Sequence, residues 1–100
     1  MKEVILSADG DSVVYSVPDM VADNLEAYCI EFCDDWIWES PDAEKYRIGN
    51  GVCYTESDFI DYLNQYVFPN EKSEMILNLG WVESEYDLPE KYRKTPRFYF

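Results

Sequence analysis

The sequence predicts one α+β domain, in which a small antiparallel sheet from two hairpins packs against two main amphipathic helices and a C-terminal segment docks on the body. Three observations predict this class: two pairs of short apolar runs that flank turn residues, two stretches with apolar residues at helical spacing, and a closing run of aromatic residues. A chain of 100 residues has the size of one domain, and half of it would bury too little core to fold alone. Residues 1–100 are therefore expected to form a single domain.

The first two strands are expected from Val4 to Leu6 and from Ser12 to Val17. Between them lies Ala8-Asp9-Gly10-Asp11, and Asp-Gly tolerates the positive φ angles of tight hairpin turns. Pro18 follows and has no N–H group to donate to a neighbouring strand. It should end the second strand.

A helix of about four turns is expected next, starting at Asp23-Asn24-Leu25-Glu26, which resembles a capping box; a start near Asp19 stays open. Its apolar side follows three- and four-residue steps. That stripe consists of Leu25, Tyr28, Cys29, Phe32, Cys33 and Trp36. Ser40-Pro41 marks its latest end, because a residue before proline avoids the helical region.

A second hairpin is expected from residues 46–48 and 52–54 around Gly49-Asn50-Gly51, and it should add two strands to the sheet. A single helical turn is possible just before it, at 42–45. The second main helix should cover residues 56–67, since Thr55 can cap it and Pro69 follows it. Its apolar stripe is Phe59, Ile60, Leu63 and Val67.

For the last third of the chain, the sequence gives weaker signals for helices and strands. Ser73 to Leu79 is interpreted as a short helix with Met75, Ile76 and Leu79 facing inward, and Gly80 as its stop. The chain closes on Phe98, Tyr99 and Phe100. Such a run is too apolar to be left in water, so it should dock on the body or on a partner.

The charge is strongly negative and unevenly distributed. The whole chain carries −13, residues 1–90 carry −17, and the basic-aromatic tail, Lys91–Phe100, carries +4. An acidic surface repels phosphates, which disfavours direct nucleic-acid binding and anionic membrane surfaces. A basic protein partner is the natural complement. No apolar stretch reaches the length of a membrane span and no signal-peptide core is present, so a cytoplasmic protein is expected.

Few residues point to catalysis. The chain has no histidine, which removes the commonest general base and metal ligand. Its three cysteines are too few for the usual four-ligand zinc site, so core packing is the favoured interpretation, and no metal or cofactor is expected. Cys53, with Arg47 in the facing strand, is the best candidate for a nucleophile.

Two tryptophans two residues apart cannot both face the core from one helix. Trp36 continues the inner stripe, which leaves Trp38, with Tyr46 and the tail aromatics, as candidates for an exposed patch. Alternatively, the C-terminal segment covers Trp38. Acidic residues surround this tryptophan, and the predicted partner-binding residues are Asp34, Asp35, Trp38, Glu39 and Asp42.

These observations predict a non-catalytic acidic protein–protein interaction module. One form would be an inhibitor or immunity-type protein that covers the basic face of a nuclease or DNA-binding protein and presents carboxylates where phosphates would lie. Two alternatives stay open: a small enzyme that uses carboxylates or Cys53, and a structural protein that self-associates through Lys91–Phe100.

Overall fold

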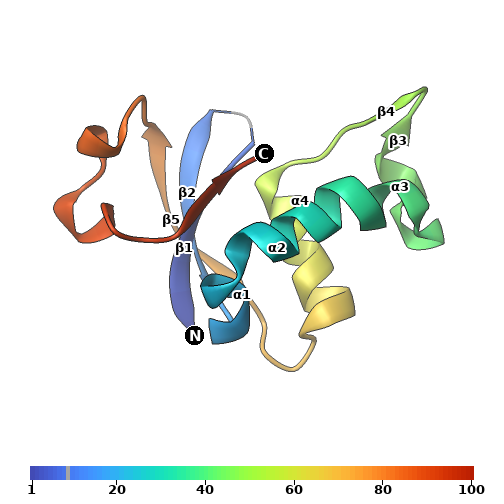
Figure 1. The fold of residues 1–100 in the computed structure, drawn as a ribbon, viewed down its shortest axis with the longest axis horizontal. Helices are drawn as coiled ribbons and strands as arrows, with labels where there is room; N and C mark the ends of the chain where they lie inside the picture. The colour runs from blue at the N-terminus through green and yellow to red at the C-terminus, as the bar shows by residue number, and fades with distance from the viewer. Residues whose placement is uncertain (9) are drawn as a thin grey trace.

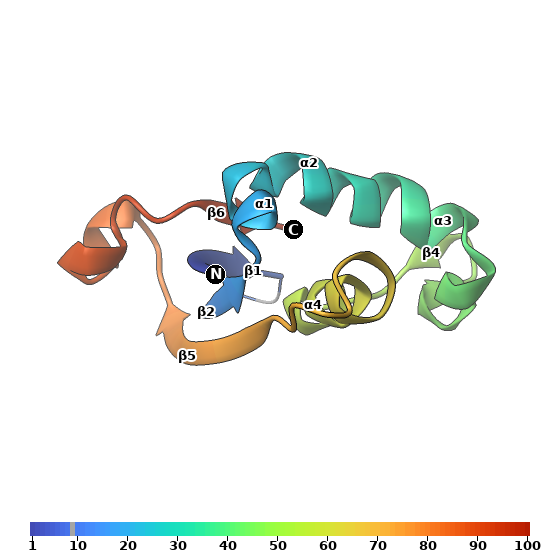
Figure 2. The same cartoon turned by 90° about the horizontal axis from the view of Figure 1, so that it is seen from below.

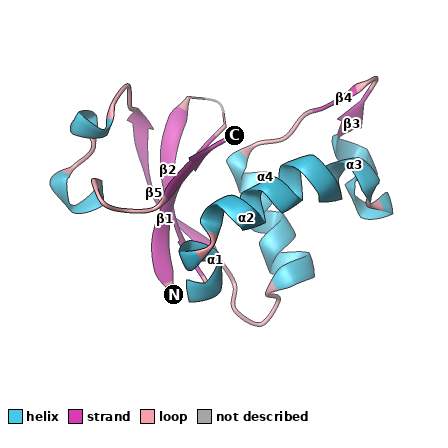
Figure 3. Cartoon of the chain, in the orientation of Figure 1, coloured by secondary structure: helices cyan, strands magenta, loops and turns pink. Residues whose placement is uncertain are grey.

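The structure, a computed structural model, describes residues 1–8 and 10–100 and confirms the α+β class. A four-stranded sheet with the order β5-β2-β1-β6 lies beside two main helical segments, and a short hairpin of β3 and β4 forms a second sheet (Figure 1). Figure 3 shows that the helices lie on one side of the four-stranded sheet, while the 3-10 turns of residues 85–87 and 90–92 lie on its other side. The four-stranded sheet is mixed, because β6 runs parallel to β1.

The predicted first hairpin is confirmed as β1 (Lys2–Ser7) and β2 (Asp11–Val17). Val4 lies opposite Tyr15, and Ile5 lies opposite Val14. Because successive side chains point to opposite faces, Val4 and Tyr15 join the core under the helices, while Ile5 and Val14 join a smaller cluster behind the sheet. In the predicted turn, Gly10 has a φ of 106°, and Asp9 lies outside the described residues.

The first helical region has four consecutive parts: α1 (Asp19–Asp23), α2 (Leu25–Ile30), the π-helix η1 (Glu31–Trp36) and α3 (Ile37–Glu39). It ends at the predicted place before Pro41. The predicted capping box does not form, since Asn24 caps α2 without a side-chain hydrogen bond, and its φ of −135° separates α1 from α2.

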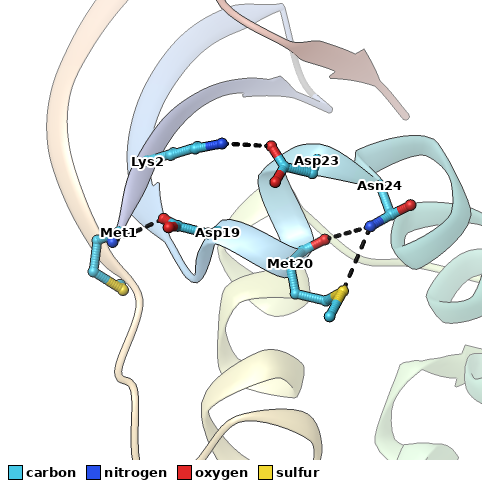
Figure 4. Close-up of polar contacts among 6 residues, drawn as sticks. All are labelled: Met1, Lys2, Asp19, Met20, Asp23 and Asn24. Carbon is cyan, nitrogen blue, oxygen red and sulfur yellow. Dashed lines mark hydrogen bonds and ion pairs between the residues drawn. The ribbon is translucent and has the colours of Figure 1, made fainter.

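Two ion pairs connect α1 to the start of β1 (Figure 4). The N-terminal ammonium lies 2.9 Å from Asp19 Oδ1, and Lys2 Nζ lies 2.7 Å from Asp23 Oδ1. Hydrogen bonding to the ammonium lowers the pKa of Asp19, and hydrogen bonding to Asp23 raises the pKa of Lys2. The short helix α1 is therefore joined to the sheet at both of its ends.

The second hairpin is confirmed, but the prediction that it extends the main sheet is wrong. A 3-10 helix, η2 (Pro41–Tyr46), leads into β3 (Arg47–Ile48) and β4 (Gly51–Val52), which pair only with each other. Both views place this hairpin at the far end of the molecule from the sheet (Figure 2). The helices thus separate the two sheets.

The second main helix is confirmed as α4 (Glu56–Tyr62), which continues as the π-helix η3 (Leu63–Val67). At its start, the Asp58 carboxylate accepts a 2.8 Å hydrogen bond from the Thr55 backbone N–H. Phe59, Ile60 and Leu63 of the predicted stripe are buried. The helix therefore packs as its apolar pattern indicates.

The helix predicted at 73–79 is wrong, because the chain forms the edge strand β5 (Glu74–Trp81), which pairs antiparallel with β2. Met75 and Ile76, expected to face inward, have exposed fractions of 61% and 44%. Leu77 and Leu79 pack against the cluster behind the sheet. Their two-residue spacing is that of a strand.

The predicted docking of the C-terminal segment on the body is confirmed. Two 3-10 turns, η4 (Glu85–Asp87) and η5 (Glu90–Tyr92), place Leu88 and Tyr92 against Ile5 and Val14. The chain then forms β6 (Arg97–Tyr99); Phe98 and Phe100 pack against the core under the helices, and Tyr99 is 54% exposed. In the described part of the chain, no helix is long and apolar enough to cross a bilayer.

Candidate functional site

Three carboxylates follow one another at four-residue steps along the first helical region. Glu31, Asp35 and Glu39 line a shallow surface cavity together with Trp36 and Ser40. Glu31 and Asp35 belong to the π-helix η1, whose wider turn keeps residues four apart close to the same side. These five residues are called the acidic groove below.

Trp36 forms the apolar wall of the acidic groove, and its ring packs against three other aromatic rings. Its ring centroid lies 4.8 Å from that of Tyr62, 5.2 Å from that of Tyr66 and 5.8 Å from that of Phe32. Phe32 is fully buried, so the tryptophan rests on the core of the domain. A partly buried indole in a fixed position loses little freedom when a partner covers it.

The far end of the groove is fixed by Arg47. Its Nε donates a 2.9 Å hydrogen bond to the Ile37 carbonyl, and its Nη2 donates to the Ser40 carbonyl. These carbonyls end the helix, where a cation is favourable and where the last C=O groups otherwise lack partners. The Ser40 hydroxyl in turn accepts a hydrogen bond from the Asp42 N–H, which starts η2.

The groove acids are not neutralised within the described part of the chain. The ion pairs there are those of the N-terminal ammonium with Asp19 and of Lys2 with Asp23, at the other end of the helical region. Lys45, the cation closest in sequence to the groove, has its Nζ 5.0 Å from the centroid of the Tyr46 ring, and Arg47 donates to backbone carbonyls. The groove therefore presents uncompensated negative charge beside an aromatic ring.

A second cavity continues along the same helical region towards the N-terminus. It is lined by Met20, Asn24, Ala27, Tyr28 and Glu31. Glu31 belongs to both cavities, so they adjoin. Apart from the shared Glu31, the lining of this second cavity is mainly apolar, and the side chain of Asn24 donates to the Met20 carbonyl, as Figure 4 shows. A ligand that covers both cavities would meet an apolar surface followed by an acidic one.

No family model matches the chain, and no curated protein or solved structure matches it. The chemistry of the groove is therefore derived from its own residues. Carboxylates accept hydrogen bonds from guanidinium and ammonium groups, and an indole face attracts the same cations.

Two of the five predicted partner-binding residues line the acidic groove, and the other three lie outside its lining. Asp35 and Glu39 line the groove. Asp34 lies outside its lining and accepts a 3.7 Å hydrogen bond from the Cys33 thiol. Trp38 is 46% exposed, so the alternative in which the C-terminal segment covers it is wrong. Asp42 is exposed in η2, two residues after Ser40 of the groove.

Three groove residues, Glu31, Trp36 and Ser40, were not among the predicted contact residues. Glu31 precedes Asp35 by four residues, so helical spacing alone could have identified it. Trp36 was assigned to the core, and it is in fact partly buried while one side lines the groove. Tyr46, predicted as part of an exposed patch, is buried at 8% exposure, so that prediction is wrong.

The three cysteines are unpaired and differ in their burial. Burial raises the pKa of the Cys29 thiol, and burial together with Asp34 raises that of Cys33, so both thiols stay protonated. Cys53 is exposed, and its backbone N–H donates to the Tyr46 carbonyl. The described residues contain no group of three potential ligands that could hold a metal ion.

Proposed function

We propose that the protein is a non-catalytic interaction module that binds a basic protein through the acidic groove. The observation that carries this proposal is the groove itself: Glu31, Asp35 and Glu39 beside Trp36, without a compensating cation among the described residues. The free cysteines fit a reducing compartment, and we place this function in the cytoplasm.

The charge of the chain supports a basic partner. A net charge of −13 attracts a cationic protein over long range and accelerates association. At the contact, an arginine of the partner can pair with Asp35 or Glu39 and stack on Trp36. Aromatic residues in fixed positions are the usual energetic centres of protein interfaces.

The form of this function that we favour is inhibition. A carboxylate-lined helix can occupy the basic surface with which a nuclease or DNA-binding protein contacts phosphates. Binding there would block nucleic acid without any chemical step. This form predicts a stoichiometric inhibitor whose potency falls as the salt concentration rises.

The test is capture of proteins from the native lysate at low and high salt with three baits. The first bait is the wild type, and the second is Asp35→Lys with Glu39→Lys. The third is the matched control Glu71→Lys with Glu90→Lys, which makes the same change in net charge at exposed residues outside the groove. Circular dichroism verifies that all three are folded.

The wild type and the control should retain the same basic protein at low salt and release it at high salt, and the groove variant should not retain it. With the captured protein purified, the groove variant should show a lower association rate that depends less on salt than that of the control. Equal retention by both double variants would refute the groove as the site. Capture of no basic protein by the wild type would refute the proposed function.

A further inference from the structure

We propose that a second copy of this chain pairs with the outer edge of β5, antiparallel and about a two-fold axis. The pairing would join two sheets into one with the strand order β6-β1-β2-β5-β5-β2-β1-β6. It uses the edge of the sheet opposite to β6, and Figure 2 shows β5 away from α3, near which the residues of the acidic groove lie.

The first observation is that the outer edge of β5 has free backbone groups. In the part of the chain that the structure describes, the backbone groups of Met75–Leu79 have no hydrogen-bond partner other than β2. An edge of this kind is a template for another strand. An eight-residue strand offers about 27 Å of such edge.

The second observation is that β5 is anchored at both ends. The Ser73 N–H donates a 2.7 Å hydrogen bond to Asn64 Oδ1, and Asn64 Nδ2 donates to the Ser73 carbonyl at 3.0 Å. Near the other end, Asn78 Nδ2 donates a 3.3 Å hydrogen bond to Asp11 Oδ2 of β2. A strand that is already ordered loses little further entropy when it pairs.

The third observation is that exposed apolar side chains gather on this strand. Met75 is 61% exposed, Ile76 44% and Trp81 70%. The strand contains no proline or lysine, the residues with which monomeric proteins usually protect an edge. Its exposed residues would be shielded from water by a paired strand.

The charge pattern favours a second copy over a basic partner at this edge. Glu74 is the only charged residue of the eight, whereas the whole chain carries a net charge of −13. In a pairing centred on the strand, Glu74 lies opposite Trp81 of the second copy. The two Glu74 carboxylates are then about 23 Å apart, well beyond the screening length of about 8 Å at physiological salt.

This geometry gives the dimer a salt dependence opposite to that of the acidic groove. Each copy carries −13, so repulsion between the bodies opposes pairing and salt should relieve it. Added salt should therefore strengthen the dimer and weaken binding of a basic partner. The two proposals can consequently fail independently.

The experiment is sedimentation equilibrium of the full chain at low and high salt, with Ile76→Lys and Met75→Lys as edge variants. Ile48→Lys is the matched control, since Ile48 is 67% exposed in β3, at the far end of the molecule. The wild type and the control should dimerise, more tightly at high salt. Each edge variant should raise the dissociation constant by at least about 10-fold while keeping its circular dichroism spectrum.

Amide hydrogen exchange of the wild type gives a second measurement that needs no substitution. Protection of the amides of Met75–Leu79 should rise with protein concentration, and that of β3 should not. A wild type that stays monomeric up to millimolar concentration at high salt would overturn the proposal. So would a dimer that the edge variants and Ile48→Lys affect equally, or exchange in β5 that is independent of concentration.

Discussion

Replacing Phe32 by leucine should destabilise the domain by about 2 kcal/mol. Phe32 is fully buried, and five aromatic rings, those of Trp36, Tyr54, Phe59, Tyr62 and Phe100, have centroids 5.3 to 6.1 Å from its own. Removing a buried phenylalanine down to alanine costs about 3–5 kcal/mol. Leucine keeps much of the apolar volume but loses the ring contacts, which gives roughly half of that cost.

The assay is urea unfolding followed by circular dichroism, supported by thermal melting. A loss of about 2 kcal/mol should lower Tm by about 8–16 °C in a domain of this size. Tyr86→Leu is the matched control, because Tyr86 is 76% exposed and its replacement should change stability by less than about 0.5 kcal/mol. A loss in Phe32→Leu as small as that of the control would refute the reasoning that Phe32 is the centre of the aromatic core.

Two further predictions concern pH and the first turn. Burial, with a smaller effect of Glu31, raises the pKa of Tyr62 to about 12, so the folded state keeps the phenol neutral while the unfolded chain ionises near pH 10. The stabilisation that comes from keeping Tyr62 neutral should be fully present below pH 10 and be lost between about pH 10 and 12, as measured by urea unfolding at each pH. In Tyr62→Phe the free energy of unfolding should fall less steeply over that range. An equal fall in the wild type and the variant would contradict this. Gly10→Ala should lower the free energy of unfolding by about 1–3 kcal/mol, because the φ angle of Gly10 is +106° and the new Cβ would lie 2.6 Å from the Trp81 ring. Gly51→Ala, whose new Cβ has its nearest atom at 3.9 Å, is the control in the same urea unfolding assay.

The parts of the fold that were predicted correctly depend on local signals. The Asp-Gly turn and the apolar runs on either side of it are sufficient to define the first hairpin. Likewise, Thr55 and Asp58 determine the start of α4 through bonds between neighbours in the sequence. Such elements need no information about distant residues.

The strand β5 could not be predicted in this way, because its conformation depends on β2, about 60 residues earlier. Met75, Ile76 and Leu79 fit the spacing of a helix, while Leu77 and Leu79 fit that of a strand. Pairing with β2 decides between the two, and register shifts beside Val13 and Tyr15 leave the adjacent residues Met75 and Ile76 both exposed. No local rule contains that pairing.

Part of the candidate site, Asp35 and Glu39, was predicted because its charges follow helical spacing. The role of Trp36 was missed because η1 is a π-helix and not an α-helix. In a regular helix, the stripe through Phe32 would place Trp36 fully inside. The wider π-helical turn instead buries Ile37 completely and leaves Trp36 partly open beside Asp35 and Glu39. Because Phe32 supports Trp36 from within, Phe32→Leu should also loosen the wall of the groove. The core and the proposed binding surface are therefore connected through the ring contacts of Trp36 with Phe32 and Tyr62.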